Sequence, residues 1–364
     1  MTPELRNSVP RLKRLLPRLR KIRMGVLGDL MLDRYLWGTA SRLSPEAAVP
    51  VVDFVSQSEC LGGAGNVAAN LATLGAHVRL FGVIGGSPGK GRKVVDDAAG
   101  AALRACLRGA GIEDAGVRPD PHRVTTVKTR VIARHQQIVR IDHERRDALD
   151  STAEESLFRL LVASLRQLDA LVLSDYDKGL LSGPFTDRVL NACHKSGVPV
   201  FVKPKTSRLV PYRGARAIVC NAKEAGFYVT RSLADEKSLE EAGRALLPHF
   251  GCAALVITRG EKGMNIFEEV SPRHLHIPAT SFEVTYARVG QPGIERGATG
   301  RQVFDVTGAG DTVLSVLSLA MAAGAALPDA AFLANTAAGV VVGKLGTASV
   351  SPSELSAALD DSRS

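Results

Sequence analysis

Short apolar runs alternate with longer stretches of helical period along most of this chain. The runs are rich in Val, Ile and Leu and lie at 24–27, 78–83, 170–174, 198–202, 217–220 and 254–258. Strands that are apolar on both faces and are separated by helices are typical of a buried parallel sheet. The pattern therefore predicts an α/β fold around a central, mostly parallel sheet.

Two other stretches follow the period of a strand, not that of a helix. Residues 35–54 hold short extended pieces with prolines at Pro45 and Pro50, and residues 124–142 alternate in β fashion with a turn near His135 and Gln136. Prolines of this kind favour edge strands. We predict a small side sheet, with segments at about 34–56 and 123–142. Some of its cationic side chains would face a substrate, and the others would face water.

Both ends of the chain and two internal segments do not fit this plan. Residues 1–22 predict a basic, partly helical lead-in broken by Pro10 and Pro17, and residues 358–364 a short tail, with the main domain at 23–357. The glycine-rich segments at 85–92 and 282–300 predict loops. The first departs from a P-loop because it lacks the first glycine and the Ser or Thr of that motif.

Composition narrows the possible functions. The net charge is +9, with eight basic residues between Arg6 and Arg23. That cluster could contact nucleic acid, but few aromatic residues lie nearby, so we expect no nucleic-acid role. The spread of the remaining basic residues suits a phosphorylated substrate. We see no apolar run of membrane-spanning length and no secretion signal, and five scattered cysteines favour reduced thiols in the cytoplasm.

Polar residues follow several of the predicted strands. In open α/β sheets, ligands bind at the carboxyl ends of the strands. Asp29 and Asp33 follow the first strand and could accept hydrogen bonds from sugar hydroxyls, although Asp29 could equally cap a turn. Later strands end in polar groups at 175–179, 203–205, 221–224 and 258–260. Glu224 could hold magnesium through water, or it could simply be an acid favoured at a helix start.

Two glycine-rich motifs carry the strongest chemical signals. Gly308-Ala309-Gly310-Asp311 precedes an apolar helical stretch, so its small residues leave the first N–H groups of that helix open to an anion. Asp311 would then lie where it can take a proton from an attacking hydroxyl, although a plain glycine turn with an acid in the first helical turn has the same sequence. The other motif, at 62–66, offers close backbone approach and an Asn66 amide to a polyol.

With these motifs in order, the chain resembles the ribokinase-like, PfkB-type sugar kinases. Segments at 26–35, 41–47, 335–347 and 350–352 look like the branch of that family that phosphorylates heptose phosphates, over roughly residues 22–357. The resemblance implies a ribokinase-like three-layer α/β/α sandwich with a small β-sheet lid. It also implies transfer of phosphate from ATP to O1 of D-glycero-β-D-manno-heptose 7-phosphate, giving the 1,7-bisphosphate for ADP-heptose and lipopolysaccharide core synthesis.

The same resemblance assigns roles to residues. Asp311 would be the catalytic base, and Gly308, Ala309 and Gly310 the anion hole. The nucleotide and magnesium side would comprise Asn221, Ala222, Lys223, Glu224, Thr258, Gly260, Asn335 and Gly339. The sugar side would comprise Asp29, Asp33, Gly62, Gly63, Asn66, Arg130, Gln136, Arg140 and Lys205. Asp305 and Thr307 would hold a monovalent cation such as K⁺.

Departures from the family pattern keep alternatives open. This chain has Lys203-Pro204-Lys205 where close relatives carry Asp-Pro-Lys, and it contains no His-x-Gly-His motif of an adenylyltransferase. We therefore expect a separate adenylyltransferase to act downstream, and a homodimer formed through the lid. The alternatives are a ribokinase-like kinase of another sugar, sugar phosphate or nucleoside, and a non-catalytic sugar- or nucleotide-binding protein.

Overall fold

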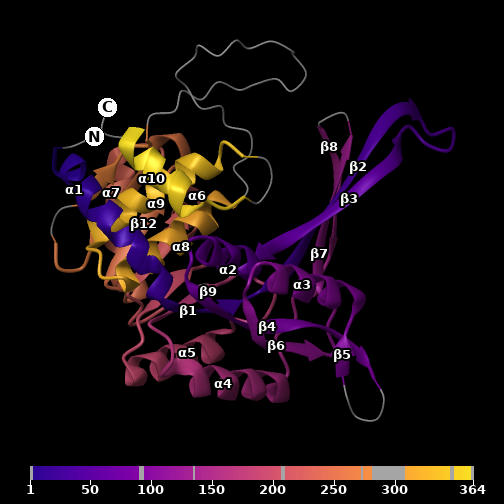
Figure 1. Ribbon diagram of the computed structural model, residues 1–364, viewed down its shortest axis with the longest axis horizontal. Coiled ribbons are helices and arrows are strands. Elements are labelled where there is room, and N and C mark those ends of the chain that lie inside the picture. Colours follow the sequence, from indigo (N-terminus) through magenta and orange to yellow (C-terminus); the bar gives the residue numbers. More distant parts are fainter. Residues whose placement is uncertain are drawn as a thin grey trace.

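The computed structural model describes residues 3–89, 94–133, 136–205, 210–271, 274–280, 308–344 and 348–361. A large sheet forms the body, and a small sheet extends from it as an arm (Figure 1). The strands of the large sheet, in spatial order, are β14 (Leu275–Ile277), β13 (Met264–Glu268), β12 (Ala254–Thr258), β11 (Ala217–Asn221), β10 (Val200–Lys203), β9 (Ala170–Ser174), β1 (Arg23–Gly28), β4 (His77–Pro88) and β5 (Val94–Asp96), with β6 (Glu113–Asp120) also paired to β4.

Strands β6, β4, β1, β9, β10, β11 and β12 run parallel to one another. The pairs β12–β13, β13–β14 and β4–β5 are antiparallel. Successive side chains of the central parallel strands β1, β9, β10, β11 and β12 enter opposite cores. In β9, for example, Val172 belongs to the core on one face of the sheet and Leu171 to the core on the other. This is why these strands have near-continuous apolar sequences.

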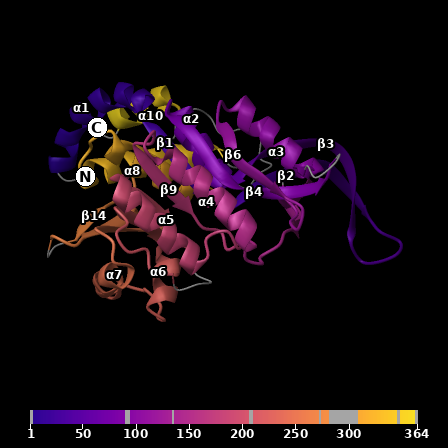
Figure 2. The same ribbon diagram turned by 90° about the horizontal axis from the view of Figure 1, so that it is seen from below.

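Helices cover both faces of the sheet (Figure 2). One face carries α1 (Pro3–Leu15), the 3₁₀ helix η1 (Leu16–Lys21), α2 (Ala64–Thr73), α3 (Ala98–Gly109), α8 (Ala309–Ala322), α9 (Leu327–Val341) and α10 (Pro352–Asp361). The other carries α4 (Ser151–Leu165), α5 (Gly183–Ser196), α6 (Ala222–Tyr228) and α7 (Glu236–Phe250). A further 3₁₀ turn, η2 (Gly260–Lys262), follows β12. The predicted three-layer α/β/α sandwich is confirmed.

The small sheet has the order β3 (Pro50–Gly63), β2 (Leu30–Leu43), β7 (Thr126–Ala133) and β8 (Gln136–His143). It extends past the predicted 34–56 segment at both ends. Its base is buried and its far end is exposed, as the burial of Leu32 and the exposure of Leu43 show. Strand β2 begins within the predicted sugar-side segment at 29–33, and β3 ends within the one at 62–66. The base of the small sheet therefore lies at these two segments.

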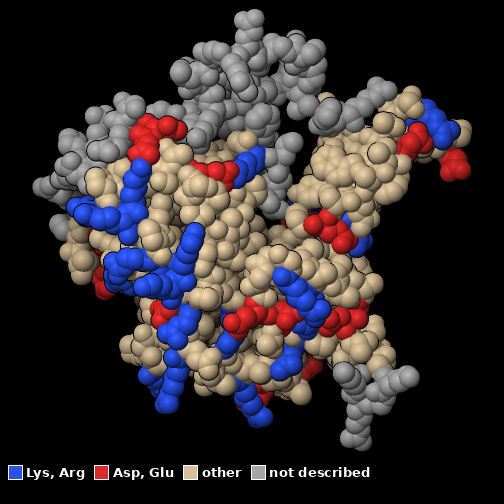
Figure 3. All heavy atoms as spheres, viewed as in Figure 1, with Lys and Arg blue, Asp and Glu red and all other residues tan. Residues whose placement is uncertain are grey.

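The predicted break at Pro10 is wrong, because α1 continues through that proline. Its apolar side, with Val9, Leu12 and Leu15, is buried against α9 and α10. Burial of each such side chain stabilises by about 1.5–3 kcal/mol, which together exceeds the ~3 kcal/mol cost of an interior proline. Arg11 and Arg14 on its other side are exposed to solvent, and basic side chains gather on this face of the molecule (Figure 3). The N-terminal segment thus packs into the same core as the rest.

Part of the loop predicted at 85–92 is strand. Gly86 and Pro88 at the end of β4 pair with Asp96 and Val94 of β5 in antiparallel register. Residues 90–93 and the loop predicted at 282–300 lie outside the described residues.

Across the described part of the chain, no helix is both long enough and apolar enough to traverse a bilayer.

Candidate active site

Asp311 lies in the first turn of α8, at the carboxyl edge of the large sheet. Gly308 caps this helix with φ of 85°, a left-handed conformation that a side chain would strain. The next turns are held in place because Val313, Leu314 and Val316 are buried in the core. The first N–H groups of the helix, which have no intrahelical partner, therefore point out at a fixed position beside Asp311.

Three side chains hold the Asp311 carboxylate, which is almost fully buried. Asn66 Nδ2 donates to Oδ2 at 2.8 Å, and the Tyr176 hydroxyl donates to Oδ1 at 2.6 Å. Lys203 Nζ forms an ion pair with Oδ1 at 2.5 Å. Hydrogen bonds of this kind, made to an ionised group, are the strong ones. The carboxylate is thus fixed in one orientation.

These partners come from three separate elements. Asn66 lies on α2, which packs against α8. Lys203 is the last residue of β10 and is the register partner of Ser174, the last residue of β9, so Tyr176 follows just beyond the same edge. The sequence placed Tyr176 and Lys203 among polar strand ends but did not connect them to Asp311. The rule that strand ends meet at one edge could have suggested the contact.

The charges around Asp311 are strongly coupled. Burial works against the ammonium, but the Asp311 carboxylate and the Tyr176 hydroxyl raise the pKa of Lys203 above its ordinary value. Burial and the Asp311 charge raise the pKa of Tyr176. At neutral pH the lysine is therefore a cation and the tyrosine a protonated donor.

Asp29 holds the loop after β9. Its Oδ2 accepts the backbone N–H groups of Tyr176 at 2.8 Å and Lys178 at 3.1 Å. Burial raises the pKa of Asp29, and burial together with the Asp29 charge raises the pKa of neighbouring Asp175 to about 7. This geometry favours the alternative that Asp29 caps a turn. A sugar contact through it stays a prediction.

Asp33, Gly62 and Arg130 meet at the base of the small sheet. Arg130 Nη1 donates to Asp33 Oδ1 at 2.6 Å, and both side chains are largely buried. A methyl group on Gly62 would lie 2.6 Å from Asp33 Oδ2, so this glycine leaves room for the carboxylate. Gly63 ends β3 as the N-cap of α2. The structure therefore brings three of the predicted sugar-side residues together.

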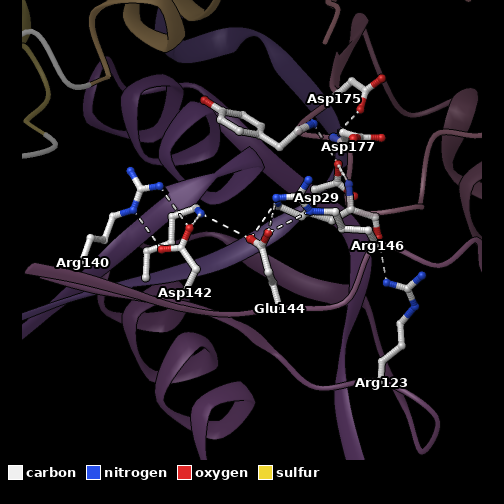
Figure 4. Close-up of polar contacts among 11 residues, drawn as sticks. Asp29, Arg123, Arg140, Asp142, Glu144, Arg146, Asp175 and Asp177 are labelled. Atoms are coloured by element: carbon white, nitrogen blue, oxygen red, sulfur yellow. Dashed lines mark hydrogen bonds and ion pairs between the residues drawn. The ribbon is translucent and has the colours of Figure 1, made fainter. Parts of the chain in front are cut away.

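A dense charge cluster lies between the small sheet and the loop held by Asp29 (Figure 4). Glu144 accepts Lys178 Nζ at 2.8 Å, Lys128 Nζ at 3.3 Å and Arg146 at 2.8 Å. Although burial opposes ionisation, these hydrogen bonds and charges lower the pKa of Glu144 to about 2. Sequence reasoning placed Lys128 among the cations of the small sheet and Lys178 in the polar strand end at 175–179. It did not connect the two lysines, and it missed Glu144, which belongs to no motif.

The remaining sugar-side candidates are Arg140, Gln136 and Lys205. Arg140 of β8 is the register partner of Arg130, but it is exposed and hydrogen bonds to Asp142. Gln136 is exposed at the start of β8. The backbone carbonyl of Lys205 accepts the Tyr228 hydroxyl at 3.0 Å. No contact in the described residues joins these three to the Asp311 cluster, and their roles stay predictions.

Most of the predicted nucleotide-side residues lie at the ends of β11 and β12. Asn221 and Thr258 are register partners, and Asn221 begins α6 through a capping box with Glu224. Ala222 and Lys223 form the first turn of α6, and Gly260 opens η2. Asn335 and Gly339 lie on α9, where Asn335 Nδ2 donates to the Pro278 carbonyl at 2.9 Å.

Little in the described chain could bind a metal on its own. It contains no group of three or more His, Cys, Asp or Glu side chains placed to do so. One Glu224 oxygen accepts the Asn221 N–H at 2.9 Å. Because Mg²⁺ is usually held by one or two carboxylates plus substrate phosphates, a single carboxylate here fits that ion. Asp305 and Thr307, the predicted monovalent-cation residues, lie outside the described residues.

Fold and site together define an α/β kinase. A carboxylate fixed at the amino end of a helix, with the residues predicted for the sugar and a second helix start predicted for the nucleotide, has the parts that phosphoryl transfer needs. The match of residues 23–354 to the model of the pfkB family of carbohydrate kinases shows that the chain belongs to that family.

Known relatives agree with this assignment. The chain is 44% identical over 341 residues to a protein named "Bifunctional protein HldE" from Geotalea uraniireducens, with 94% of this chain and 64% of that protein aligned. It is also 44% identical to the protein of the same name from Geobacter sulfurreducens, covering 91% of this chain and 61% of that protein. The chain thus spans less than two thirds of these relatives.

Solved structures show the same fold at low identity. Phosphofructokinase-2 from Escherichia coli, in complex with potassium, superposes with a TM-score of 0.71 and 17% identity, over 93% of this chain and 98% of that chain. Ribokinase from Arabidopsis thaliana, complexed with ribose and ATP, superposes with a TM-score of 0.67 and 18% identity, over the same shares. The ribokinase-like fold is therefore confirmed.

Proposed function

We propose that this kinase transfers the terminal phosphate of ATP to O1 of D-glycero-β-D-manno-heptose 7-phosphate. The observation that carries the proposal is the Asp311 carboxylate, fixed by Asn66, Tyr176 and Lys203 at the amino end of α8. The identity to relatives named HldE supports the heptose branch of the family. The product would enter ADP-heptose and lipopolysaccharide core synthesis, where an adenylyl transfer would follow later.

In the proposed reaction, Asp311 accepts the proton of the sugar hydroxyl as its oxygen attacks the terminal phosphorus. The bond from that phosphorus to the bridging oxygen breaks, and ADP leaves. The N–H groups at Ala309 and Gly310 would receive the negative phosphoryl oxygens, which small residues leave accessible. Magnesium, held through water by Glu224, would supply further neutralising charge.

The charge cluster suits the phosphate that the acceptor sugar already carries. Lys128 and Lys178 are held by Glu144 next to the loop that Asp29 fixes. Asp33 and Arg130 lie on neighbouring strands of the same sheet. A sugar that bridges Asp311 and this region would place a distal phosphate among cations, which favours a sugar phosphate over a free sugar.

A substrate panel tests the proposal. ADP release would be measured with heptose 7-phosphate, fructose 6-phosphate and ribose as acceptors at saturating ATP. We expect turnover with the heptose phosphate about tenfold or more above ribose, because the site fits an acceptor with a remote phosphate. We also expect it to exceed turnover with fructose 6-phosphate, because the similar relatives are named HldE. Turnover with ribose or fructose 6-phosphate but none with the heptose phosphate would overturn the substrate assignment.

We also propose that two chains pair through their small sheets. Leu43, Phe54, Val55 and Ile141 on these strands each expose more than half of their surface, and the visible face of the arm is largely uncharged (Figure 3). Burying such side chains would favour association. Sedimentation of the wild type and Phe54→Glu tests this, and equal mass for both, as monomers, would contradict it. We further propose the cytoplasm as the compartment, because none of the five cysteines, all of which lie among the described residues, forms a disulfide.

A further inference from the structure

Lys203 lies between two groups that the reaction uses. Its Nζ pairs with Asp311 Oδ1 at 2.5 Å, and a methyl group built on Gly310 would lie 3.4 Å from the same Nζ. The ammonium therefore contacts the proposed base and lies beside the amino end of α8. No other lysine in the described residues contacts Asp311.

The arrangement places two positive groups around one carboxylate. The amino end of a helix carries a partial positive charge, and Lys203 adds a full one beside it. Asp311 is the anion that balances them here. The pairing also opposes catalysis, because a carboxylate oxygen held by an ammonium is less available to take a proton.

The Lys203 ammonium has one donor available for a further acceptor. An ammonium has three donors, of which Asp311 and the Tyr176 hydroxyl at 3.2 Å use two, and no third acceptor lies among the described residues. Its side chain is 17% exposed, so it reaches the edge of the site. An oxygen of a phosphoryl group at the start of α8 would lie within reach of that third donor.

We propose that Lys203 is a catalytic residue that binds the transferring phosphoryl group of ATP, and that it pairs with Asp311 only until that group arrives. On nucleotide binding the ammonium would move to a terminal phosphate oxygen, which neutralises the developing charge and releases Asp311 Oδ1 for the sugar hydroxyl. The inference rests on the proposed phosphoryl transfer at Asp311 but not on which sugar accepts the phosphate.

The test compares two nucleotides that differ in the terminal phosphate. ADP and the non-hydrolysable analogue AMP-PNP would be titrated by calorimetry, with equal Mg²⁺, into wild type, Lys203→Met and the surface control Lys195→Met. We expect Lys203→Met to weaken AMP-PNP by about 10- to 100-fold and ADP by less than about threefold, since only AMP-PNP carries the group that the ammonium would contact. The control should match wild type for both nucleotides.

A second variant pair separates this role from a structural one. Asp311→Asn removes the competing carboxylate, so it should increase the affinity for AMP-PNP relative to that for ADP. Adding Lys203→Met to this variant should reverse the part of the increase that depends on the lysine. A lower melting temperature with an unchanged ratio of ADP to AMP-PNP affinity would show a structural ion pair only and overturn the proposal. If Lys203→Met does not fold, Lys203→Gln, which keeps a hydrogen-bonding head group, is measured in the same way.

The outcomes distinguish this inference from the substrate assignment. A shifted nucleotide ratio without turnover of heptose 7-phosphate would leave the role of Lys203 intact and overturn the choice of sugar. Turnover of the heptose phosphate with an unshifted nucleotide ratio would support the choice of sugar and overturn the role of Lys203.

Discussion

Replacing Gly62 with alanine tests whether the base of the small sheet forms part of the sugar site. The new methyl carbon would lie 2.6 Å from Asp33 Oδ2 and 2.8 Å from Met31 Cγ, closer than real contacts allow. Asp33 cannot move away freely because Arg130 holds it and both are buried. Overpacking of this kind costs about 1–3 kcal/mol. A carboxylate displaced by about 1 Å also costs up to ~10²-fold in catalytic efficiency.

The assay is steady-state turnover together with thermal unfolding. We expect Gly62→Ala to raise KM for the sugar phosphate about tenfold or more, to leave KM for ATP within about threefold, and to lower the melting temperature. Gly183→Ala is the matched control, because a methyl group there meets nothing within 4 Å. It isolates the ~0.4–1 kcal/mol that alanine contributes by restricting the unfolded chain. If both variants behave alike, Asp33 and Gly62 do not shape the sugar site.

Three further substitutions probe other parts of the account. Asn66→Ala removes a hydrogen bond to a buried carboxylate, which is worth about 1.5–3 kcal/mol. We therefore expect kcat to fall about 10- to 100-fold, with KM for ATP little changed. An unchanged kcat would contradict the role of Asn66 in positioning Asp311. Leu12→Ala should lower the free energy of unfolding by about 2–5 kcal/mol in urea titrations, whereas exposed Arg14→Ala should not; equal effects would mean that α1 is only a lead-in. The native pKa of Asp175, about 7, exceeds the ordinary 3.8, so the native state binds its proton more tightly and loses stability as pH rises through 7. Between pH 6 and 8 the wild type should lose about 1.4 kcal/mol of its free energy of unfolding through this group, and Asp175→Asn should not show that loss. An equal loss in both proteins would refute this.

Much of the fold could be predicted from the sequence because parallel strands buried on both faces leave a clear pattern. The strands predicted at 170–174 and 254–258 are those observed. Pro10 misled the prediction, because local propensity argues for a break whereas burial of Val9 and Leu12 against other helices outweighs it. Tertiary packing of this kind is invisible to a local rule.

The site was only partly predictable for a similar reason. Asp311 and its glycines form a contiguous motif that the sequence displays. Its partners Tyr176 and Lys203 lie 135 and 108 residues away along the chain, and the register of β9 and β10 brings them together. Glu144 and its lysines have no motif at all. Contacts fixed by strand register become visible only once the sheet is assembled.

The most direct test of the central claim is the turnover of Asp311→Asn with ATP and heptose 7-phosphate, measured beside wild type. Asparagine keeps the shape of the side chain but cannot accept the hydroxyl proton as a carboxylate does. We predict a fall in kcat of about 10²–10⁴-fold, the usual loss for a positioned base, with ADP binding unchanged. Turnover within about threefold of wild type would contradict the account.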